Sequence, residues 1–337
     1  MNKFISVLFA GIVLLSGCGK PNDAESLKPG DAGYKVVSTI YTSGFSNDVL
    51  LDDSLLYIAQ GEGGLLIYNI NDPYNPAFVS LTTEGLRGYA GKIAKKDSAV
   101  YLAANTFGIN VVDVRDPDTP VVTITNLGVK PARSFHVLGN YLFTAISEQG
   151  VGIAEVSYPT EPDIRVQFPT TGYAYGLTTS SDSNYLFVAG GEMGLSIYNI
   201  SNFQEGFGIY PQTGWCDTPG DAEAVIIDND KKLAFLACGT AGLQILDYAD
   251  TANIFIAGTF DSAGYAKDLL YTGNLVYLSA ELGGFQIIDV TDHTMPKLLG
   301  AIQTKFALGL DMDEDFIYMA DEDEGVLVIS KPLIGIQ

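Results

Sequence analysis

A few polar, charged and aromatic side chains that could do chemistry recur at one position of a repeating pattern in this chain. Glu223 paired with Lys267 or with Tyr175 would give a general acid and a general base, the two groups needed to cleave a glycosidic bond. The same side chains, together with Asn47 and Arg133, would instead hold a ligand by charge, hydrogen bonding and aromatic contact. The choice depends on whether the fold brings these five residues to one place.

Other catalytic residue types are scarce. The 337 residues include two His, three Cys and one Trp, and His136 and His293 lie far apart in the sequence. Neither histidine belongs to a recognisable arrangement of nucleophile and base, so we expect no catalytic set of this kind, no metal site and no cofactor.

The densest acidic run of the chain, Asp311 to Asp315, has oxygen ligands at the alternate positions that a calcium loop uses. The sixth position of such a loop should be glycine, and here it is Phe316. The run also aligns with tight hairpins of other repeats, where Asp is favoured for backbone reasons. We therefore interpret it as a solvated turn.

The chain is strongly acidic, with 40 Asp and Glu against 18 Lys and Arg and a formal charge of -22. This charge argues against nucleic acid and against an anionic membrane face as partners. Hydrophobic residues make up 47% of the chain, which is enough for a large core. We expect a globular body.

One motif of about 40 residues is repeated seven times, and this changes the assignment of the whole fold. Each unit has a strand of the type aromatic-x-Ala, a short loop, a glycine and an alternating strand rich in β-branched residues. The glycines are Gly64, Gly108, Gly150, Gly194, Gly242, Gly284 and Gly325, at intervals of 44, 42, 44, 48, 42 and 41 residues. Alternation and turn residues predict four antiparallel strands per unit, as at 266–271, 276–280, 284–290 and 297–302. The chain is therefore predicted to be all-β, a seven-bladed β-propeller over residues 34–337.

The two ends of the repeat region complement each other. The seventh unit stops after its third strand at Ser330, and residues 34–42 (YKVVSTIYT) form an unassigned strand before the first unit. We predict that 34–42 completes the last blade as its fourth strand, which closes the ring and removes a free sheet edge.

The third strands LLIYNI, INVVDV, LSIYNI and FQIIDV, with Asp-Pro following in the first two units, resemble those of the LVIVD-repeat propellers. The resemblance covers about residues 34–330, with departures such as VGIAEV in the third unit. It implies an exported, surface-associated β-propeller, and it implies architecture rather than a defined activity.

The first strands of propeller blades line the central channel, and each of them starts here with a small residue, namely Ser46, Ala90, Ala132, Ala174, Ala222, Ala266 and Ala307. The next position varies most in chemical character: Asn47, Gly91, Arg133, Tyr175, Glu223, Lys267 and Leu308. Structural positions of a repeat protein should themselves repeat, so this variation predicts a ligand-binding rim. The predicted rim residues are Asn47, Arg133, Tyr175, Glu223 and Lys267. A rim that is merely solvated is the alternative.

Residues 1–18 have the pattern of a signal peptide. A positively charged start precedes the apolar run Phe4 to Leu15, which is too short for a permanent membrane span. Leu15-Ser16-Gly17-Cys18 resembles the lipobox of bacterial lipoproteins, so Cys18 is the predicted lipid attachment site. Residues 19–33, rich in Pro, Gly and acids, are predicted to be a flexible tether. By resemblance to lipoproteins of diderm bacteria, Gly19 indicates the outer membrane, on its periplasmic or surface face.

Cys216 and Cys238 are the thiols that remain after processing. In an exported protein they are expected to form a disulfide, with two inert thiols as the alternative.

Two functions are compatible with this sequence. The favoured one is a non-catalytic binding or interaction scaffold of the cell envelope, which is anchored to the membrane by lipid and holds an envelope protein or a glycan at the channel mouth. The alternative is a polysaccharide hydrolase or lyase built on the propeller.

Overall fold

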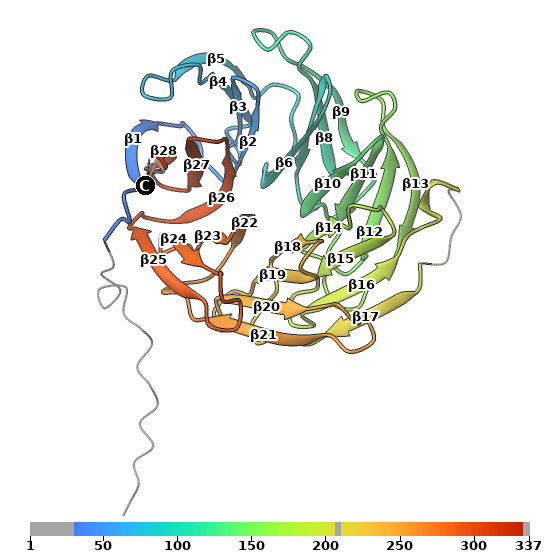
Figure 1. The fold of residues 1–337 in the computed structure, drawn as a ribbon. Helices are drawn as coiled ribbons and strands as arrows, with labels where there is room; N and C mark the ends of the chain where they lie inside the picture. The colour runs from blue at the N-terminus through green and yellow to red at the C-terminus, as the bar shows by residue number, and fades with distance from the viewer. Residues whose placement is uncertain (1–29, 206–209, 333–337) are drawn as a thin grey trace, which may run out of the picture.

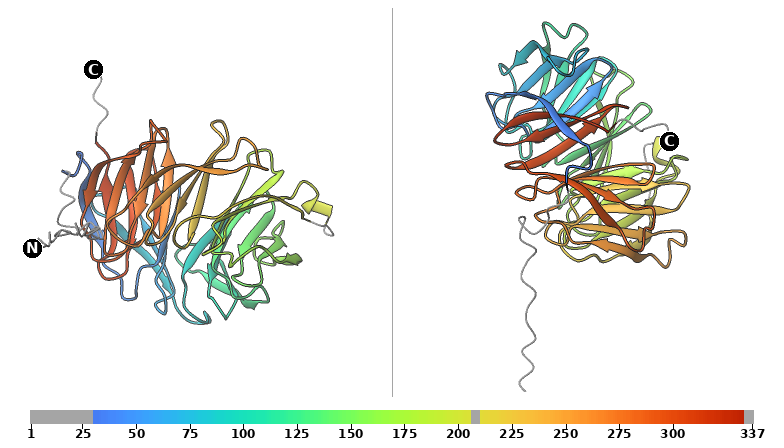
Figure 2. Two further views of the ribbon diagram at one scale, coloured as in Figure 1. Left: turned by 90° about the horizontal axis from the view of Figure 1, so that it is seen from below. Right: turned by 60° about the vertical axis from the view of Figure 1, so that its left-hand side comes forward.

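The computed structural model describes residues 30–205 and 210–332, which form a closed ring of seven four-stranded antiparallel sheets (Figure 1). Figure 2 shows the ring from the side, with the strands standing between its two faces. The 3-10 helix η1 (Phe203–Glu205) is the one helical element of the described residues. The predicted all-β, seven-bladed propeller is confirmed.

The blades follow one another in chain order, and the first strand of each lies nearest the axis. Blade 1 consists of β2 (Asp48–Asp52), β3 (Leu55–Ala59), β4 (Leu65–Asn69) and β5 (Ala77–Thr82). Blade 2 consists of β6 (Lys92–Lys96), β7 (Ala99–Ala103), β8 (Ile109–Asp113) and β9 (Val121–Leu127). Blade 3 consists of β10 (Ser134–Leu138), β11 (Tyr141–Ala145), β12 (Val151–Glu155) and β13 (Asp163–Phe168). Blade 4 consists of β14 (Gly176–Thr179), β15 (Tyr185–Ala189), β16 (Leu195–Asn199) and β17 (Gln212–Cys216).

The remaining blades have the same plan. Blade 5 consists of β18 (Ala224–Asp228), β19 (Leu233–Ala237), β20 (Leu243–Asp247) and β21 (Phe255–Phe260). Blade 6 consists of β22 (Asp268–Thr272), β23 (Leu275–Ser279), β24 (Phe285–Asp289) and β25 (Lys297–Ile302). Blade 7 consists of β26 (Ala307–Met312), β27 (Phe316–Asp321), β28 (Gly325–Ser330) and, from the start of the chain, β1 (Lys35–Ile40).

The glycine that marks each repeat is needed for its backbone conformation. All seven have positive φ, between 69° and 94°, a region that L side chains rarely adopt. At Gly64 a Cβ would also lie only 2.2 Å from the carbonyl oxygen of Thr82 in the neighbouring strand. The regular spacing that reveals the repeat in the sequence therefore has a steric cause.

The hydrophobic core is divided into seven clusters, one at each boundary between adjacent blades. Alternation along a strand explains this, because successive side chains point to opposite faces of a sheet. In β3, Leu56 and Ile58 pack against blade 7, whereas Tyr57 and Ala59 pack against blade 2. Each inner strand thus contributes to two clusters, and the ring is held together by apolar packing all the way round.

The ring closes as predicted. Strand β1 pairs antiparallel with β28, from Lys35 opposite Ser330 to Ile40 opposite Val326. The hydroxyl of Tyr34, just before β1, lies 3.0 Å from that of Tyr277 in blade 6. The predicted closing strand 34–42 is thus confirmed, with the paired part spanning Lys35–Ile40.

The predicted signal peptide (1–18), Cys18 and most of the tether (19–33) lie outside the described residues. The last residues of the tether are part of a turn, in which the Tyr34 amide donates to the carbonyl of Asp31 at 2.9 Å. No helix in the described ranges has the length and apolar character needed to cross a membrane.

Candidate functional site

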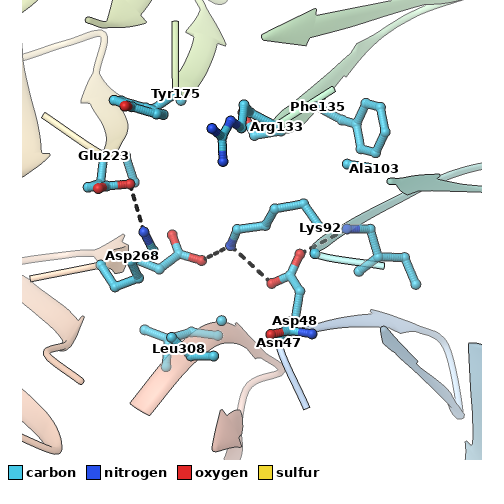
Figure 3. Close-up of a pocket in the computed structure, with 18 of the residues that line it drawn as sticks. Asn47, Asp48, Lys92, Ala103, Arg133, Phe135, Tyr175, Glu223, Asp268 and Leu308 are labelled. Atoms are coloured by element: carbon cyan, nitrogen blue, oxygen red, sulfur yellow. Dashed lines mark hydrogen bonds and ion pairs between the residues drawn. The ribbon is translucent and has the colours of Figure 1, made fainter. Parts of the chain in front are cut away.

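A cavity of about 710 Å³ lies on the axis of the ring, where the starts of the seven first strands meet (Figure 3). All the residues of the variable repeat position line it, and we call them the mouth layer: Asn47, Gly91, Arg133, Tyr175, Glu223, Lys267 and Leu308. The structure therefore brings the five candidate rim residues to one cavity, and their role in binding a ligand stays a prediction.

The recurring small residue explains why the blades approach so closely. At six of the seven blade boundaries it forms a backbone bridge with the loop between the second and third strands of the preceding blade. Ala90 and Gly61, for example, exchange two amide-to-carbonyl hydrogen bonds of 3.1 Å. Each bridge fixes the backbone of the small residue, and the next residue along the chain, which belongs to the mouth layer, therefore lies at the cavity.

On the side of blades 5 and 6, the mouth layer contains a closed polar group. Both oxygens of Glu223 are engaged, because Tyr265 donates to Oε1 and Lys267 donates to Oε2, each at 2.8 Å. Burial, reinforced by the hydrogen bond to Glu223 and by the charges of Glu223 and Asp221, raises the pKa of Tyr265. This phenol therefore keeps its proton at neutral pH and acts as a donor.

On the side of blades 3 and 4, the mouth layer is open. Arg133 donates from Nε to the Ser147 hydroxyl at 2.8 Å, and its guanidinium carbon lies 5.5 Å from the centre of the Tyr175 ring. Tyr175 stacks in turn on Tyr173, with ring centres 6.4 Å apart and planes at 18°. No ion pair joins Arg133 to a carboxylate within residues 30–205 and 210–332. Its terminal amino groups are thus available to a ligand.

Asn47 lines the cavity but has a structural role. Its amide group donates to the carbonyls of Phe45 and Ala90, each at 3.0 Å, and its oxygen accepts from the Tyr89 hydroxyl at 3.1 Å. All three partners lie in blade 1 or blade 2 or in the segments leading into them, so Asn47 joins two blades. Of the five predicted rim residues, it is the least free to meet a ligand.

Aromatic side chains surround the mouth layer, a feature that the sequence analysis missed. The residue immediately before the small residue is aromatic in five of the seven units: Phe45, Tyr89, Tyr173, Tyr265 and Phe306. Two of these rings pack against glycines of the preceding blade, since a Cβ at Gly61 would meet Tyr89 at 2.6 Å and one at Gly239 would meet Tyr265 at 2.8 Å. Aligning one position before the small residue would have revealed this pattern.

One residue beyond the mouth layer, a second set of charges spans the axis, and we call Asp48, Lys92 and Asp268 the deep layer. Lys92 of blade 2 donates to Asp48 of blade 1 at 3.1 Å and to Asp268 of blade 6 across the channel (Figure 3). Asp48 also accepts the amide of Ile93 at 3.0 Å. Sequence reasoning missed these residues, although the position after the mouth layer carries a charge in three of the seven repeats.

Burial and charge oppose each other in the deep layer. Burial raises the pKa of Asp48 to about 6, with Lys92 lowering it and Asp268 adding to the rise. Burial alone would lower the pKa of Lys92, but the charges of Asp268 and Asp48 outweigh it and raise this pKa. Lys92 therefore stays protonated, and its single positive charge offsets part of the negative charge of the two carboxylates.

The predicted disulfide between Cys216 and Cys238 is not formed, and both thiols are free. Cys216 ends the outermost strand of blade 4, opposite Leu195, whereas Cys238 is buried in the core between blades 4 and 5. The Cys238 sulfur lies 3.6 Å from the hydroxyl of Thr218, and burial raises its pKa to about 12. The structure thus differs from the predicted disulfide, because it holds both cysteines as free thiols, with Cys216 packed against the same apolar cluster that contains Cys238.

The acidic run from Asp311 to Asp315 is a hairpin, as interpreted from the repeats. Asp313 accepts the amides of Asp315 at 2.8 Å and of Phe316 at 2.7 Å, and Asp311 accepts the amide of Leu51 in blade 1 at 2.7 Å. These carboxylates therefore accept hydrogen bonds from backbone amides. Within the described ranges, no three His, Cys, Asp or Glu side chains are grouped so as to hold a metal ion.

Seven four-stranded sheets around an axial cavity define the protein as a seven-bladed β-propeller. Three segments match the family model for the LVIVD repeat, at residues 43–83, 131–170 and 263–304, which correspond to blades 1, 3 and 6. The protein is therefore a β-propeller with LVIVD repeats in these three blades. The predicted resemblance is confirmed, and it includes blade 3, whose third strand was noted as a departure.

Solved structures share the fold at low sequence identity. The WD40 β-propeller domain of Doa1 has a TM-score of 0.67 at 11% identity, over 89% of this chain and 97% of that one. A chain of the mitotic checkpoint complex has a TM-score of 0.66 at 12% identity, over 98% and 99%. The computationally designed Ika8 protein has a TM-score of 0.59 at 11% identity, over 85% and 83%. No curated protein matches the chain in sequence. At such identities the likeness concerns the fold alone.

Proposed function

We propose that this propeller is a non-catalytic binding module of the cell envelope, which holds a protein or a glycan at the mouth of its axial cavity. One observation carries the proposal. The repeat position that differs most between units is also the position whose seven residues share a cavity of about 710 Å³. Positions that maintain the ring mostly repeat from blade to blade, as the small residue and the glycine do, so variation at a position that lines a cavity supports a role in ligand binding.

The mouth layer has the features that ligand recognition needs. Arg133 brings a positive charge that no carboxylate pairs with in the part of the chain that the structure describes, and Tyr175 and Tyr173 bring stacked aromatic faces. Tyr173 is 53% exposed, so its ring can contact a sugar or a side chain directly. Charged and aromatic groups on a rigid scaffold favour specific binding.

The location in the envelope rests on the sequence. Cys18 as the lipidated residue would tie the protein to the outer membrane, and residues 19–29 would give the ring a distance from the lipid surface. Replacement of Cys18 by Ala gives a soluble form for binding experiments.

The test compares two forms of this Cys18→Ala chain, one with the native mouth layer and one carrying Arg133→Ala, Tyr175→Ala, Glu223→Ala and Lys267→Ala. Both are used as bait against envelope extract and against a glycan array. We expect a ligand that the native form retains and the quadruple variant loses, while the melting temperatures show that both are folded. Equal retention by the two forms would contradict a binding site at the mouth.

A polysaccharide hydrolase or lyase is the second candidate, because Glu223, Lys267 and Tyr265 meet within hydrogen-bonding distance beside the cavity. Two features weigh against it. Both oxygens of Glu223 are engaged, and the raised pKa of Tyr265 keeps its phenol protonated, so that it is a weak acid and is not available as a base at neutral pH. Incubation of each bound glycan with the protein decides the matter, since new reducing ends or unsaturated products would establish catalysis.

A further inference from the structure

The boundary between blade 7 and blade 1 differs from the other six. Every other boundary has a backbone bridge between the loop of one blade and the small residue of the next. Here the equivalent residues are Glu322 and Ser46, and in the described structure no bridge joins them. The Glu322 amide donates to Phe306 within its own blade at 3.0 Å, and the Ser46 hydroxyl lies 2.9 Å from that of Thr42. The boundary between blades 7 and 1 therefore lacks the backbone bridge that the other six boundaries have on this face.

This boundary has a recess of about 250 Å³, which we call the seam recess. Residues 41–45 line one side and residues 322–325 line the other. Blades 7 and 1 remain joined further along the axis, where the Gly309 amide donates to the Asn47 carbonyl at 3.0 Å. The recess is thus a local feature of one face and not a gap through the ring.

Two aromatic rings and three carboxylates meet in the seam recess. Tyr41 is 81% exposed and Phe45 is 50% exposed, although both rings are large and apolar. Opposite them stand the consecutive acids Glu322, Asp323 and Glu324. Aromatic faces and carboxylates both attract a cation, and neither attracts an anion.

Comparison with the other repeats shows that this composition is particular to the seam. The three residues at the start of the equivalent loops contain at most one acid, as in Gly61-Glu62-Gly63 and Gly191-Glu192-Met193. Only in blade 7 are all three acidic. A structural requirement of the propeller does not explain this, because six blades fold without it.

The acidic loop is held in place before any ligand arrives. Asp321, fully buried, accepts the amides of Phe306 at 2.7 Å, Asp323 at 3.0 Å and Glu324 at 2.8 Å. Lys305 approaches Glu324 only to 3.8 Å, and no ion pair in the described part of the chain involves Glu322 or Asp323. A fixed loop with uncompensated charge favours binding of a cation, because little order has to be imposed.

The charge of the recess acts on its surroundings. The pKa of Glu281 in blade 6 is raised by burial, with Glu223 and Glu322 adding to the rise. The pKa of Tyr89 is raised by burial too, with Glu322 and Glu62 contributing. Lys267 opposes the rise at Glu281, and the charge of Glu322 contributes to the rise of both pKa values.

We infer that the seam recess binds a lysine or arginine side chain presented by a basic segment of a protein partner. The carboxylates pair with the cationic head, and the rings of Tyr41 and Phe45 cover it and its aliphatic stem. The formal charge of -22 attracts such a partner from a distance. The inference rests on the proposed function only in placing the partner on the mouth face, and a neutral glycan would not use the recess.

The test titrates the Cys18→Ala full chain with the peptide acetyl-Gly-Gly-Arg-Gly-Gly-amide by isothermal titration calorimetry at low salt. The peptide with Gln in place of Arg is the control ligand. We expect the Arg peptide to bind about fivefold tighter or more, as close charge and cation-π contacts imply. Equal affinity for the two peptides would overturn the inference.

Matched variants locate the binding. Glu322→Gln with Asp323→Asn should weaken the Arg peptide about fivefold, whereas Glu148→Gln with Glu192→Gln, exposed acids of equivalent loops in blades 3 and 4, should change it less than about twofold. Tyr41→Ala should weaken it as well, and Tyr158→Ala, at a residue 77% exposed, should not. If both pairs of acid substitutions weakened the Arg peptide equally, the peptide would be attracted to the acidic surface in general, and the inference of a site at the seam recess would be overturned.

The quadruple variant of the mouth layer separates this inference from the proposed function. It should lose the envelope ligand and still bind the Arg peptide as the parent does. If it retains the envelope ligand, the proposed function fails while the seam recess stands. If the quadruple variant loses the envelope ligand, but the seam variants bind the Arg peptide as their control variants do, the inference fails and the proposed function stands.

Discussion

The mouth layer and the deep layer lie one residue apart on the same strands, yet they treat charge in opposite ways. In the deep layer, Lys92 is matched by Asp48 and Asp268, and the cluster ties blades 1, 2 and 6 together across the axis. In the mouth layer, Arg133 forms no ion pair with a carboxylate of the described residues, and Tyr175 offers it an aromatic face. The comparison teaches that one channel combines a cluster of ion pairs that joins blades with an outward-facing layer, which is the surface that we propose for ligand recognition.

The largest expected effect comes from removing the central charge of the deep layer. Lys92→Met would leave Asp48 and Asp268 without their cation, and loss of one partner of a buried pair costs about 3 kcal/mol of unfolding free energy. Urea unfolding at neutral pH measures this loss. Arg133→Met, which removes a cation from the mouth layer, is the matched control and should cost less than about 1 kcal/mol. Similar losses of unfolding free energy in Lys92→Met and Arg133→Met would show that the deep layer does not stabilise the fold more than the mouth layer does.

The second effect concerns pH and sharpens the role of Asp48. In the unfolded chain Asp48 ionises near its ordinary pKa of about 4, whereas in the folded protein it does so at about 6. Between these values the folded protein holds a proton that the unfolded chain releases, so Asp48 adds stability as pH falls and this contribution is lost as pH rises through 6.

Asp48→Asn lacks this proton uptake. From about pH 7.5 to about pH 4.5, the stability of the native protein should therefore improve relative to the variant by about 2 kcal/mol. Urea unfolding of both proteins across this range gives the difference directly. A constant difference between the two would show that Asp48 titrates normally.

The smallest effect on stability is expected at the mouth layer. Tyr175→Leu keeps an apolar side chain against Gly191 and removes the stacked ring, so the unfolding free energy should change by less than about 1 kcal/mol. Affinity for the captured ligand should fall instead. A variant that loses stability but binds normally would place Tyr175 with the structural residues.

The fold was predictable because its steric requirements recur in each unit. The seven glycines have positive φ, which makes their spacing visible in the sequence, and the missing fourth strand of the last unit identified residues 34–42 as its complement. The observed strand ends differ from the predicted ones by only one or two residues, as in blade 6, where 266–271 was predicted and β22 spans Asp268–Thr272. Local rules of turns and alternation are sufficient for such features.

The candidate site was only partly predictable, because contacts across the axis do not follow the order of the repeats. Lys92 reaches Asp268, which lies 176 residues later in the sequence and in a blade that is not its neighbour. The engagement of Asn47 by two blades depends on backbone carbonyls, which no residue pattern displays. The free thiol of Cys238 reflects the direction of a buried side chain, which also has no sequence signature.

The closing strand has a consequence for the order of events during folding. Lys35 and Ser330 are 295 residues apart, so β1 cannot find its partner until almost the whole chain has been made. Until that time β1 is an unpaired edge, and blade 7 has no outer strand. Six blades can pack as they emerge, but completion of the ring waits for the last of them, which makes this step the slow one and the one most exposed to aggregation.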